Sequence, residues 1–235
     1  EPPAPLKKYL NSKQWLFRDS NWSPDFATSA EKALWFYQQE NGPEKNFNGV
    51  LAITPSYMAS LLKVIGNQKI DGVLFTPDNL VDALEERVGK GYYTLGIPEA
   101  ERKSIIGKLG LQIKDEVFKL PMARMADVAK ATIESLEEKQ ILIYHKSPMV
   151  QELLNKNNWS GAIRPFQGDY LFVVDTNIAS LKTDQVVDRE VNYELRPDRD
   201  DLIAKVSIVY NNQGRFTWKT TRLRSWTRVY VPKDS

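Results

Sequence analysis

The residues whose side chains could most readily take part in binding or catalysis are Arg18 and Asp19, which lie between Trp15 and Trp22 just before an amphipathic segment. A loop that is held by aromatic side chains and presents charge is a common carrier of binding sites. The simpler alternative is that the guanidinium and the carboxylate pair with each other and close a turn, and spacing alone favours this alternative. The aromatic spacing also predicts that both tryptophans are largely buried.

Few other residues could do chemistry. His145 is the only histidine, so a Ser-His-Asp triad or a histidine metal cluster would need it, and we interpret it as structural at a strand end. Asp198, Asp200 and Asp201 lack the glycine and the distal glutamate of a calcium loop. They predict a solvated hairpin tip instead.

The last predicted strand, residues 222–231, alternates cationic and aromatic side chains on one face. That face could bind a polyanion or a sugar. The alternative, which we favour, is that the arginines lie along aromatic rings or that the strand continues a larger sheet. An unpaired edge can template another chain, so we expect a homodimer through the C-terminal sheet. The alternating side chains are Arg222, Arg224, Trp226, Arg228 and Tyr230.

Composition limits the function classes. The chain has 235 residues, a formal net charge of +2 and no cysteine. Balanced charge argues against a nucleic-acid partner bound by bulk charge, and the lack of cysteine excludes a disulfide scaffold, a zinc ribbon and a cysteine nucleophile. No apolar run approaches the roughly 20 residues of a membrane span. The opening residues 1–5, Glu-Pro-Pro-Ala-Pro, are typical of a linker, so we expect a piece of a longer protein.

A helix is expected directly after the Arg-Asp loop. Thr28 and Glu31 have the spacing of a capping box, and the residues 41–43, Asn-Gly-Pro, end the helix near Gln39. A strand, a Thr-Pro step and an amphipathic helix then occur twice, which predicts consecutive β-α units on one sheet. These two units span residues 47–65 and 71–88.

The remaining pattern changes along the chain. Helical periodicity is followed by short alternating segments with turn residues between them. The predicted helices are 98–114, 122–138 and 148–155, and the predicted strands are 141–144, 170–174, 186–195, 202–210 and 222–231. We therefore predict an α/β domain over residues 1–167, with a mixed sheet flanked by helices. An antiparallel β-sheet module over residues 168–235 follows, and we expect it to continue beyond this chain.

Several segments carry a family resemblance. They are RDSNWSPDF at 18–26, NGVLAITP at 48–55, VDTN at 174–177 with KTD at 182–184, and RVYVP at 228–232. With them the chain resembles the bacterial domain-of-unknown-function 4012 family over nearly its whole length. Members are cell-envelope proteins, usually behind an N-terminal membrane anchor, with no assigned activity. The resemblance implies an extracytoplasmic protein whose anchor lies outside this chain.

The order of parts is also similar to the LytR-CpsA-Psr phosphotransferases, which move glycopolymers from a polyprenyl-pyrophosphate carrier onto the cell wall. This likeness implies Arg18 and Asp19 as catalytic residues, with Asp19 holding Mg²⁺, which bridges phosphates. Guanidinium groups suit the remaining role because their planar fork donates two parallel hydrogen bonds to phosphate oxygens. The implied ligand-binding residues are Arg87, Arg102, Asn21 and Asp25.

Two functions stay open. The first is an extracytoplasmic protein that binds or transfers a pyrophosphate-linked glycopolymer, in which Arg18, Asp19, Arg87 and Arg102 converge on one cleft. The second is a non-catalytic binding or structural module of the bacterial cell surface that keeps the fold without the chemistry. The partner in the first case is a cell-wall or lipid-linked glycopolymer. Fold-level analogy does not decide between them, so enzymatic activity is left open.

Overall fold

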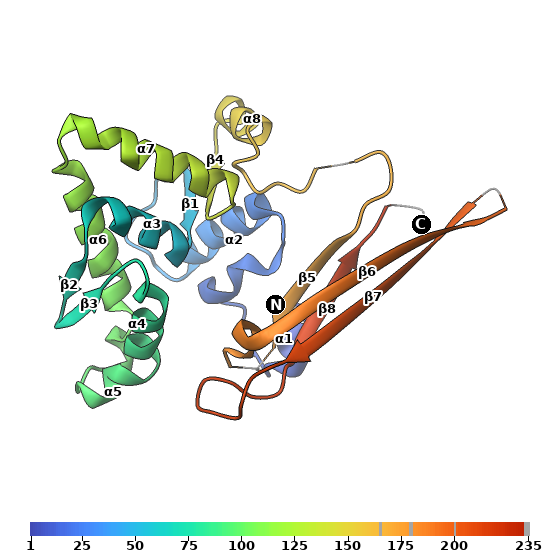
Figure 1. Ribbon diagram of the computed structural model, residues 1–235, viewed down its shortest axis with the longest axis horizontal. Coiled ribbons are helices and arrows are strands. Elements are labelled where there is room, and N and C mark those ends of the chain that lie inside the picture. The colour runs from blue at the N-terminus through green and yellow to red at the C-terminus, as the bar shows by residue number, and fades with distance from the viewer. Residues whose placement is uncertain (165, 179–180, 200, 233–235) are drawn as a thin grey trace. The chain divides into compact units, whose positions relative to one another are not determined.

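The computed structural model describes residues 1–164, 166–178, 181–199 and 201–232 (Figure 1). By its internal contacts the chain divides into two compact units. We call Ser23–Ile163 the helical unit, and Glu1–Trp22 together with Arg164–Ser235 the β unit. The expected domain boundary after residue 167 stays a prediction; the contacts divide the chain near residue 163 and group the first 22 residues with the C-terminal part.

The helical unit consists mainly of α-helices with two short sheets. Its helices are α2 (Phe26–Gln39), α3 (Pro55–Ile65), α4 (Leu80–Glu86), α5 (Tyr92–Thr94), α6 (Ser104–Phe118), α7 (Met122–Glu137) and α8 (Pro148–Lys156). A π-helical turn, η2 (Arg87–Gly91), and a 3-10 turn, η3 (Glu99–Glu101), lie between α4 and α6. The strands pair antiparallel, as β1 (Gly49–Ile53) with β4 (Ile141–His145) and β2 (Gln68–Ile70) with β3 (Val73–Phe75).

The core of the helical unit joins α3, α4 and α6 to the β2–β3 hairpin. Apolar residues recur every three or four positions on each helix, so each helix has one face to bury. Phe75, Leu80, Ile105 and Leu109 are completely buried in this cluster. The apolar faces of these three helices are buried at most positions, although Ile106 of α6 is 42% exposed.

The α/β class with a following antiparallel β module is confirmed, but the strands of the helical unit do not share one sheet. The reason lies in Asp71 and Gly72, which have φ values of 47° and 82°. Two central residues with positive φ form the tight turn that suits a two-residue hairpin. Therefore β2 and β3 pair with each other, Ile70 opposite Val73, instead of starting separate β-α units.

The first helix of this unit starts earlier than the sequence pattern predicts. Helix α2 begins at Phe26, and Asp25 is its N-cap. The Asp25 carboxylate accepts a hydrogen bond from the Thr28 amide at 2.9 Å, which satisfies one of the free amides of the first turn. The capping box expected at Thr28 and Glu31 is therefore wrong, and Glu31 instead accepts a hydrogen bond from the Tyr144 hydroxyl.

The β unit contains two antiparallel ribbons. Its elements are α1 (Ala4–Tyr9), η1 (Phe17–Trp22), β5 (Phe172–Asn177), η4 (Thr183–Val186), β6 (Val187–Asp198), β7 (Asp201–Asn212) and β8 (Ser225–Tyr230). Strand β5 pairs with β8, and the 12-residue strands β6 and β7 form a long hairpin. At about 3.3 Å per residue this hairpin is about 40 Å long.

The two faces of the β5–β8 ribbon have different neighbours within the β unit. One face carries Asp175 opposite Thr227. The other carries Trp226 and Arg228, and residues of the first segment of the chain pack on it. Tyr9 of α1 lies 6.0 Å from the Trp226 ring, centroid to centroid. These contacts explain why the first 22 residues group with strands that follow them by some 150 residues.

Trp15 and Trp22 are mostly buried, with a smaller part of each residue left exposed, so the expectation that both are largely buried is confirmed. The Trp22 ring is covered on one side by the Arg228 guanidinium, 4.5 Å from its centroid, and an amphipathic ring of this kind keeps part of its edge in water. The Trp15 indole donates a hydrogen bond to the Asp19 carbonyl at 2.8 Å. The loop between the tryptophans is therefore fixed by polar contacts as well as by burial.

Candidate functional site

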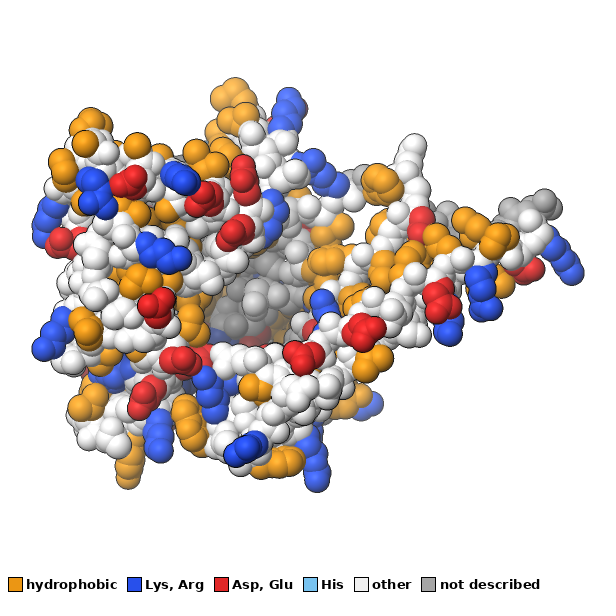
Figure 2. All heavy atoms as spheres, in the orientation of Figure 1, with side chains coloured by type: hydrophobic (Ala, Val, Ile, Leu, Met, Phe, Trp, Pro, Cys, Tyr) orange, Lys and Arg blue, Asp and Glu red, His pale blue; other side chains and the backbone are white. Residues whose placement is uncertain are grey.

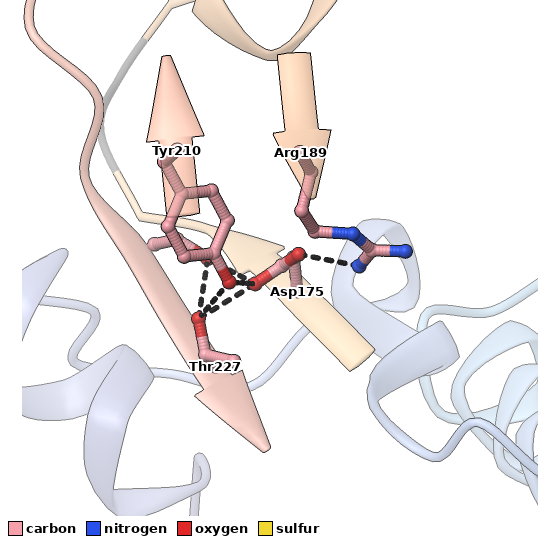
Figure 3. Close-up of polar contacts among 5 residues, drawn as sticks. Asp175, Arg189, Tyr210 and Thr227 are labelled. Carbon is pink, nitrogen blue, oxygen red and sulfur yellow. Dashed lines mark hydrogen bonds and ion pairs between the residues drawn. The ribbon is translucent and has the colours of Figure 1, made fainter. Parts of the chain in front are cut away.

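The β unit places four polar side chains around one carboxylate (Figure 3). Asp175 lies in the middle of β5, directly opposite Thr227 of β8. Arg189 of β6 and Tyr210 of β7 are likewise opposite each other in the hairpin. Side chains of opposite residues in an antiparallel pair lie on the same face. Each ribbon therefore presents one polar pair, and the two pairs meet at Asp175.

Asp175 uses both carboxylate oxygens. Its Oδ1 accepts hydrogen bonds from the hydroxyls of Thr227 at 2.6 Å, Tyr210 at 2.7 Å and Ser225 at 3.0 Å. Its Oδ2 accepts one from Arg189 Nη1 at 2.7 Å. Hydrogen bonds to an ionised acceptor are about twice as strong as neutral ones. The carboxylate therefore links the base of the hairpin to the β5–β8 ribbon.

The environment of Asp175 favours its ionised form. Burial on its own would raise the pKa of this carboxyl group, but the bonds from Thr227, Tyr210, Arg189 and Ser225 outweigh it, and the pKa is lowered from its ordinary value. The pKa of Tyr210 is raised, because burial together with the bond to the Asp175 anion outweighs the opposing effects of the Thr227 hydrogen bond and the Arg189 charge. At neutral pH the site is thus a carboxylate surrounded by neutral hydroxyls and one cation.

A small cleft of about 260 Å³ opens beside this cluster. Besides the cluster residues, its wall contains Asn177 and Asp184, whose side chains are hydrogen-bonded to each other at 2.7 Å. Val187 and Leu223 supply an apolar patch. The cleft therefore combines hydrogen-bond acceptors, a guanidinium donor and an aliphatic surface, which is the composition of a site for a small polar ligand.

On the opposite face of β8 an arginine lies along an aromatic ring, which is the alternative that the sequence favours over a ligand-binding face. Arg228 stacks on Trp22 and donates from Nη1 to the Trp22 carbonyl at 2.9 Å. Phe172 and Tyr230 lie together with ring centroids 5.8 Å apart. Since strand β8 begins at Ser225, Arg222 and Arg224 precede it. This face is packed by aromatic and N-terminal residues, which leaves the Asp175 face as the polar site of the unit.

The predicted catalytic pair, Arg18 and Asp19, lies in η1 of the β unit. Arg18 Nε is 3.6 Å from Asp19 Oδ2, and the Arg18 side chain is 69% exposed. Both residues line a shallow cavity of about 470 Å³ formed with α1 and the loop after it. Asn21 is exposed in the same turn. The pair thus adopts the simple arrangement that the spacing favours, and a catalytic role stays a prediction.

The other predicted ligand-binding residues, Arg87, Arg102 and Asp25, belong to the helical unit. Arg87 is 4% exposed, and its Nε and Nη1 have no hydrogen-bond partner among the described residues. Arg102 donates to the carbonyl of the adjacent Val88 at 3.1 Å and lies over the Tyr92 ring. These two arginines therefore lie near η2, while convergence with the Arg-Asp pair of the β unit stays a prediction.

Asp25 has a local structural role. Its second oxygen accepts a hydrogen bond from the Ile163 amide at 3.0 Å, in addition to the Thr28 bonds. Burial acts to raise its pKa, but these hydrogen bonds prevail and the pKa is lowered. The carboxylate thus fixes the first turn of α2 to the end of the helical unit, and a ligand role for it stays a prediction.

Mg²⁺ is the metal that the phosphotransferase likeness implies at Asp19. The described residues contain no group of three or more His, Cys, Asp or Glu side chains placed to hold a metal ion. Asp19 offers one carboxylate, and that carboxylate faces Arg18. Mg²⁺ takes six oxygen ligands, usually from one or two carboxylates with phosphates and water. One paired carboxylate does not form such a set by itself, and Mg²⁺ binding at Asp19 stays a prediction.

His145 and the aspartates at the end of the β6–β7 hairpin have structural roles. His145 Nδ1 accepts a hydrogen bond from the Ser147 amide at 3.0 Å, which closes the turn before α8. Asp198 is opposite Asp201 at the end of the β6–β7 hairpin, as expected for a hairpin tip. Asp200 lies outside the described residues.

Comparison with known proteins gives one partial match. Residues 1–88 match the family described as protein of unknown function (DUF4012). The match covers two of the segments that carry the resemblance, at 18–26 and 48–55, and supports that part of the sequence interpretation. No curated protein and no solved structure matches the chain. The LytR-CpsA-Psr likeness stays a prediction.

Across the described residues, no helix has the length and apolarity needed to cross a membrane.

The Asp175 site was not predicted from the sequence, although a signal for it was present. The segments at 174–177 and 182–184 were among those that carry the DUF4012 resemblance, and they contain Asp175, Asn177 and Asp184. A charged residue inside the strand sequence FVVDTN also needs a partner when most of its side chain is withdrawn from water, and the Asp175 side chain is 27% exposed. The partners Arg189 and Tyr210 follow only from strand pairing, which the sequence pattern did not specify.

Proposed function

We propose that this chain is an extracytoplasmic, cell-envelope-associated protein whose β unit binds a hydroxyl-rich segment of a glycopolymer without transferring it. The observation that carries the binding role is the cleft beside Asp175, where ordered polar groups surround a small aliphatic patch. The DUF4012 resemblance supports the envelope assignment.

The chemistry of the cleft suits a saccharide. Sugar hydroxyls both donate and accept hydrogen bonds, so they match a wall that offers an Asp184 carboxylate and an Arg189 guanidinium. Among the described residues, Arg189 makes a hydrogen bond only to Asp175, so most of its N–H groups remain available to a ligand. The C–H face of a sugar ring can pack on Val187 and Leu223. The volume of about 260 Å³ limits the bound segment to about one sugar ring.

Transfer of a pyrophosphate-linked glycopolymer is the second candidate, and the observation that favours it is Arg87. Its buried guanidinium has two nitrogens without a hydrogen-bond partner among the described residues. Buried polar groups of this kind usually have partners, and a phosphate oxygen would satisfy them. The binding role is preferred because the Asp175 cleft is open and the Arg189 side chain on its wall is 40% exposed, whereas Arg87 is almost completely buried.

A titration of the isotope-labelled chain with chitotriose, an oligosaccharide of N-acetylglucosamine, tests the binding role by NMR. We expect saturable amide shifts around the Asp175 cleft. Asp184→Asn should weaken binding roughly tenfold because a charge-assisted hydrogen bond to the ligand is lost. Asp188→Asn is the matched control, since Asp188 directly follows the cleft residue Val187 in β6 but does not line the cleft.

Equal affinities of the two variants, or shifts spread over the whole chain, would exclude the cleft as the site. A parallel titration with inorganic pyrophosphate separates the two candidates. Shifts confined to residues around η2 would support the Arg87 site and the transfer hypothesis. Pyrophosphate shifts in neither unit, together with saccharide shifts at the cleft, would support binding alone.

We also propose that the β unit forms a homodimer through the C-terminal sheet, with the apolar face of the β6–β7 hairpin at the interface. Cross-strand partners place Val191, Leu195 and Leu202 on one face of the hairpin, and they are 36%, 45% and 63% exposed. Figure 2 shows hydrophobic side chains along this hairpin. Two such faces can pack against each other as layers of a sandwich.

Light scattering over a range of protein concentrations tests this interface. The unmodified chain is expected to show a concentration-dependent rise towards twice the monomer mass, and Leu202→Asp is expected to remain monomeric because burying the new charge is costly. Leu111→Asp is the control, since Leu111 is similarly exposed, at 60%, but lies on α6 of the helical unit. A monomer at every concentration would contradict the interface.

A further inference from the structure

The helical unit contains an apolar cleft that the proposed function does not use. It has a volume of about 270 Å³ and is lined by residues of β1, α3, α6 and α7. Leu51 and Ile53 of β1 and Phe118 of α6 lie on its wall, although they are 61%, 45% and 79% exposed. Large apolar side chains gathered at one cleft and left in water usually mark an interaction site.

A glycine on the wall of this cleft provides a second observation. Helix α6 has glycines at 107 and 110, inside its length, where glycine is a poorer helix former than alanine. Apart from the adjacent residues and the backbone of α6 itself, no atom lies within 4 Å of the position that a Cβ would take at either residue, so packing against other elements does not require glycine there. Gly110 lines the cleft, and its missing side chain lets a ligand approach the helix backbone.

The size of the cleft indicates a narrow occupant. One turn of α-helix is about 5.4 Å high and 10–12 Å wide, so it needs well over about 400 Å³. A cleft of about 270 Å³ does not enclose such a turn, whereas an extended hydrocarbon chain is narrow enough to lie in it. The polar group of Tyr57, which also lines the cleft, is already hydrogen-bonded to Thr132 at 3.0 Å. Its ring therefore adds apolar surface to the wall.

The charge at the cleft indicates the head group. Among the described residues that line the cleft, Lys114 is the charged one. Its ion pair with the adjacent Asp115, at 3.1 Å, is exposed on both sides and therefore weak. An anionic group held at the mouth would be attracted to the Lys114 ammonium. We propose that this cleft binds the hydrocarbon chain of a single-chain amphiphile whose anionic head group lies beside Lys114.

This site is independent of the saccharide cleft, because the two lie in different units and differ in chemistry. Dodecanoate below its micelle concentration is a suitable probe, and calorimetric titration gives its affinity. Gly110→Ala should weaken dodecanoate binding roughly tenfold because the added methyl group occupies the cleft wall. The same substitution should raise the melting temperature of the helical unit by about 2–4 °C, since alanine favours the helix.

Gly107→Ala is the matched control. It should raise the melting temperature by a similar amount and change dodecanoate affinity by less than about twofold, since Gly107 does not line the cleft. Opposite effects of Gly110→Ala on stability and on affinity support a ligand site. The proposal is overturned if the unmodified chain shows no saturable dodecanoate binding, or if both alanine variants bind with unchanged affinity.

Lys114→Gln tests the head group separately. It should weaken dodecanoate binding about fivefold. The affinity for dodecyltrimethylammonium, which has the same chain and a cationic head, should not fall. Butanoate, which keeps the anionic head but has a short chain, should bind at least tenfold more weakly than dodecanoate. Equal losses for the two long-chain probes would overturn the head-group assignment, and equal binding of butanoate and dodecanoate would overturn the chain assignment.

Discussion

Replacing Phe75 with alanine is expected to lower the free energy of unfolding of the helical unit by about 3–5 kcal/mol. Phe75 ends strand β3 and is completely buried among core side chains of α3, α4 and α6. Alanine would leave a cavity in a close-packed interior, because these helices can relax only partly around it. Urea unfolding followed by circular dichroism at 222 nm measures the change, since the α-helices lie mainly in this unit.

The adjacent residue gives a matched control on the same strand. Leu74 is 50% exposed, so Leu74→Ala removes little buried area and should cost less than about 1 kcal/mol. If the two variants lost similar stability, the β2–β3 hairpin would not be oriented as described. A loss of less than about 1 kcal/mol for Phe75→Ala would show that this residue is not in the core.

Much of the helical unit could be predicted from periodicity. Helix α7 (Met122–Glu137) and strand β4 (Ile141–His145) follow the predicted ranges closely, because long apolar periodicity and a short apolar run are strong signals. Helix α6 starts at Ser104 instead of Pro98, after the separate 3-10 turn η3. Element ends depend on local hydrogen bonds more than on periodicity, so they are the least predictable part.

The predictions that failed depended on contacts between distant residues. Thr28 and Glu31 fit a capping box, but Asp25 has the stronger position because it also accepts a bond from the Ile163 amide, 138 residues away. The Asp71-Gly72 pair was assigned to a strand start, whereas it forms the turn of a hairpin. Each local pattern admitted two structures, and tertiary contacts or backbone conformation selected between them.

The candidate site shows the same limit more clearly. Asp175 and Thr227 are 52 residues apart and meet only through the register of β5 and β8. Arg189 and Tyr210 meet through the hairpin register. A shift of one residue in either ribbon would move one pair to the other face. The residue types were visible in the sequence, but their meeting point was not.

Replacing Asp175 with asparagine is expected to lower the free energy of unfolding of the β unit by about 2–3 kcal/mol at neutral pH. Asparagine keeps one acceptor for the hydroxyls of Thr227 and Tyr210 but presents an N–H group towards Arg189. The link between the hairpin and the β5–β8 ribbon is thereby weakened. The expected loss is moderate because 27% of the Asp175 side chain is exposed, and water can replace part of the lost bonding.

The pH dependence of this loss identifies the ionised carboxylate as its source. The pKa of Asp175 is lower in the folded chain than its ordinary value, so its stabilisation is complete above the unfolded pKa of about 3.9. The stabilisation is lost as the pH falls through the lower, folded pKa. The difference in unfolding free energy between the unmodified chain and Asp175→Asn should therefore be constant above about pH 5 and shrink below about pH 4.

Urea unfolding at pH 7, 5, 4 and 3, followed by tryptophan fluorescence, measures this difference, since four of the six tryptophans belong to the β unit, namely Trp15, Trp22, Trp218 and Trp226. Asp188→Asn is the control, because Asp188 is exposed on the opposite face of the hairpin from Arg189 and should change stability little at any pH. A difference as large at pH 3 as at pH 7 would show that the loss comes from altered packing. A shrinking difference assigns it to the Asp175 anion, which then fixes the hairpin and the adjoining cleft in one geometry.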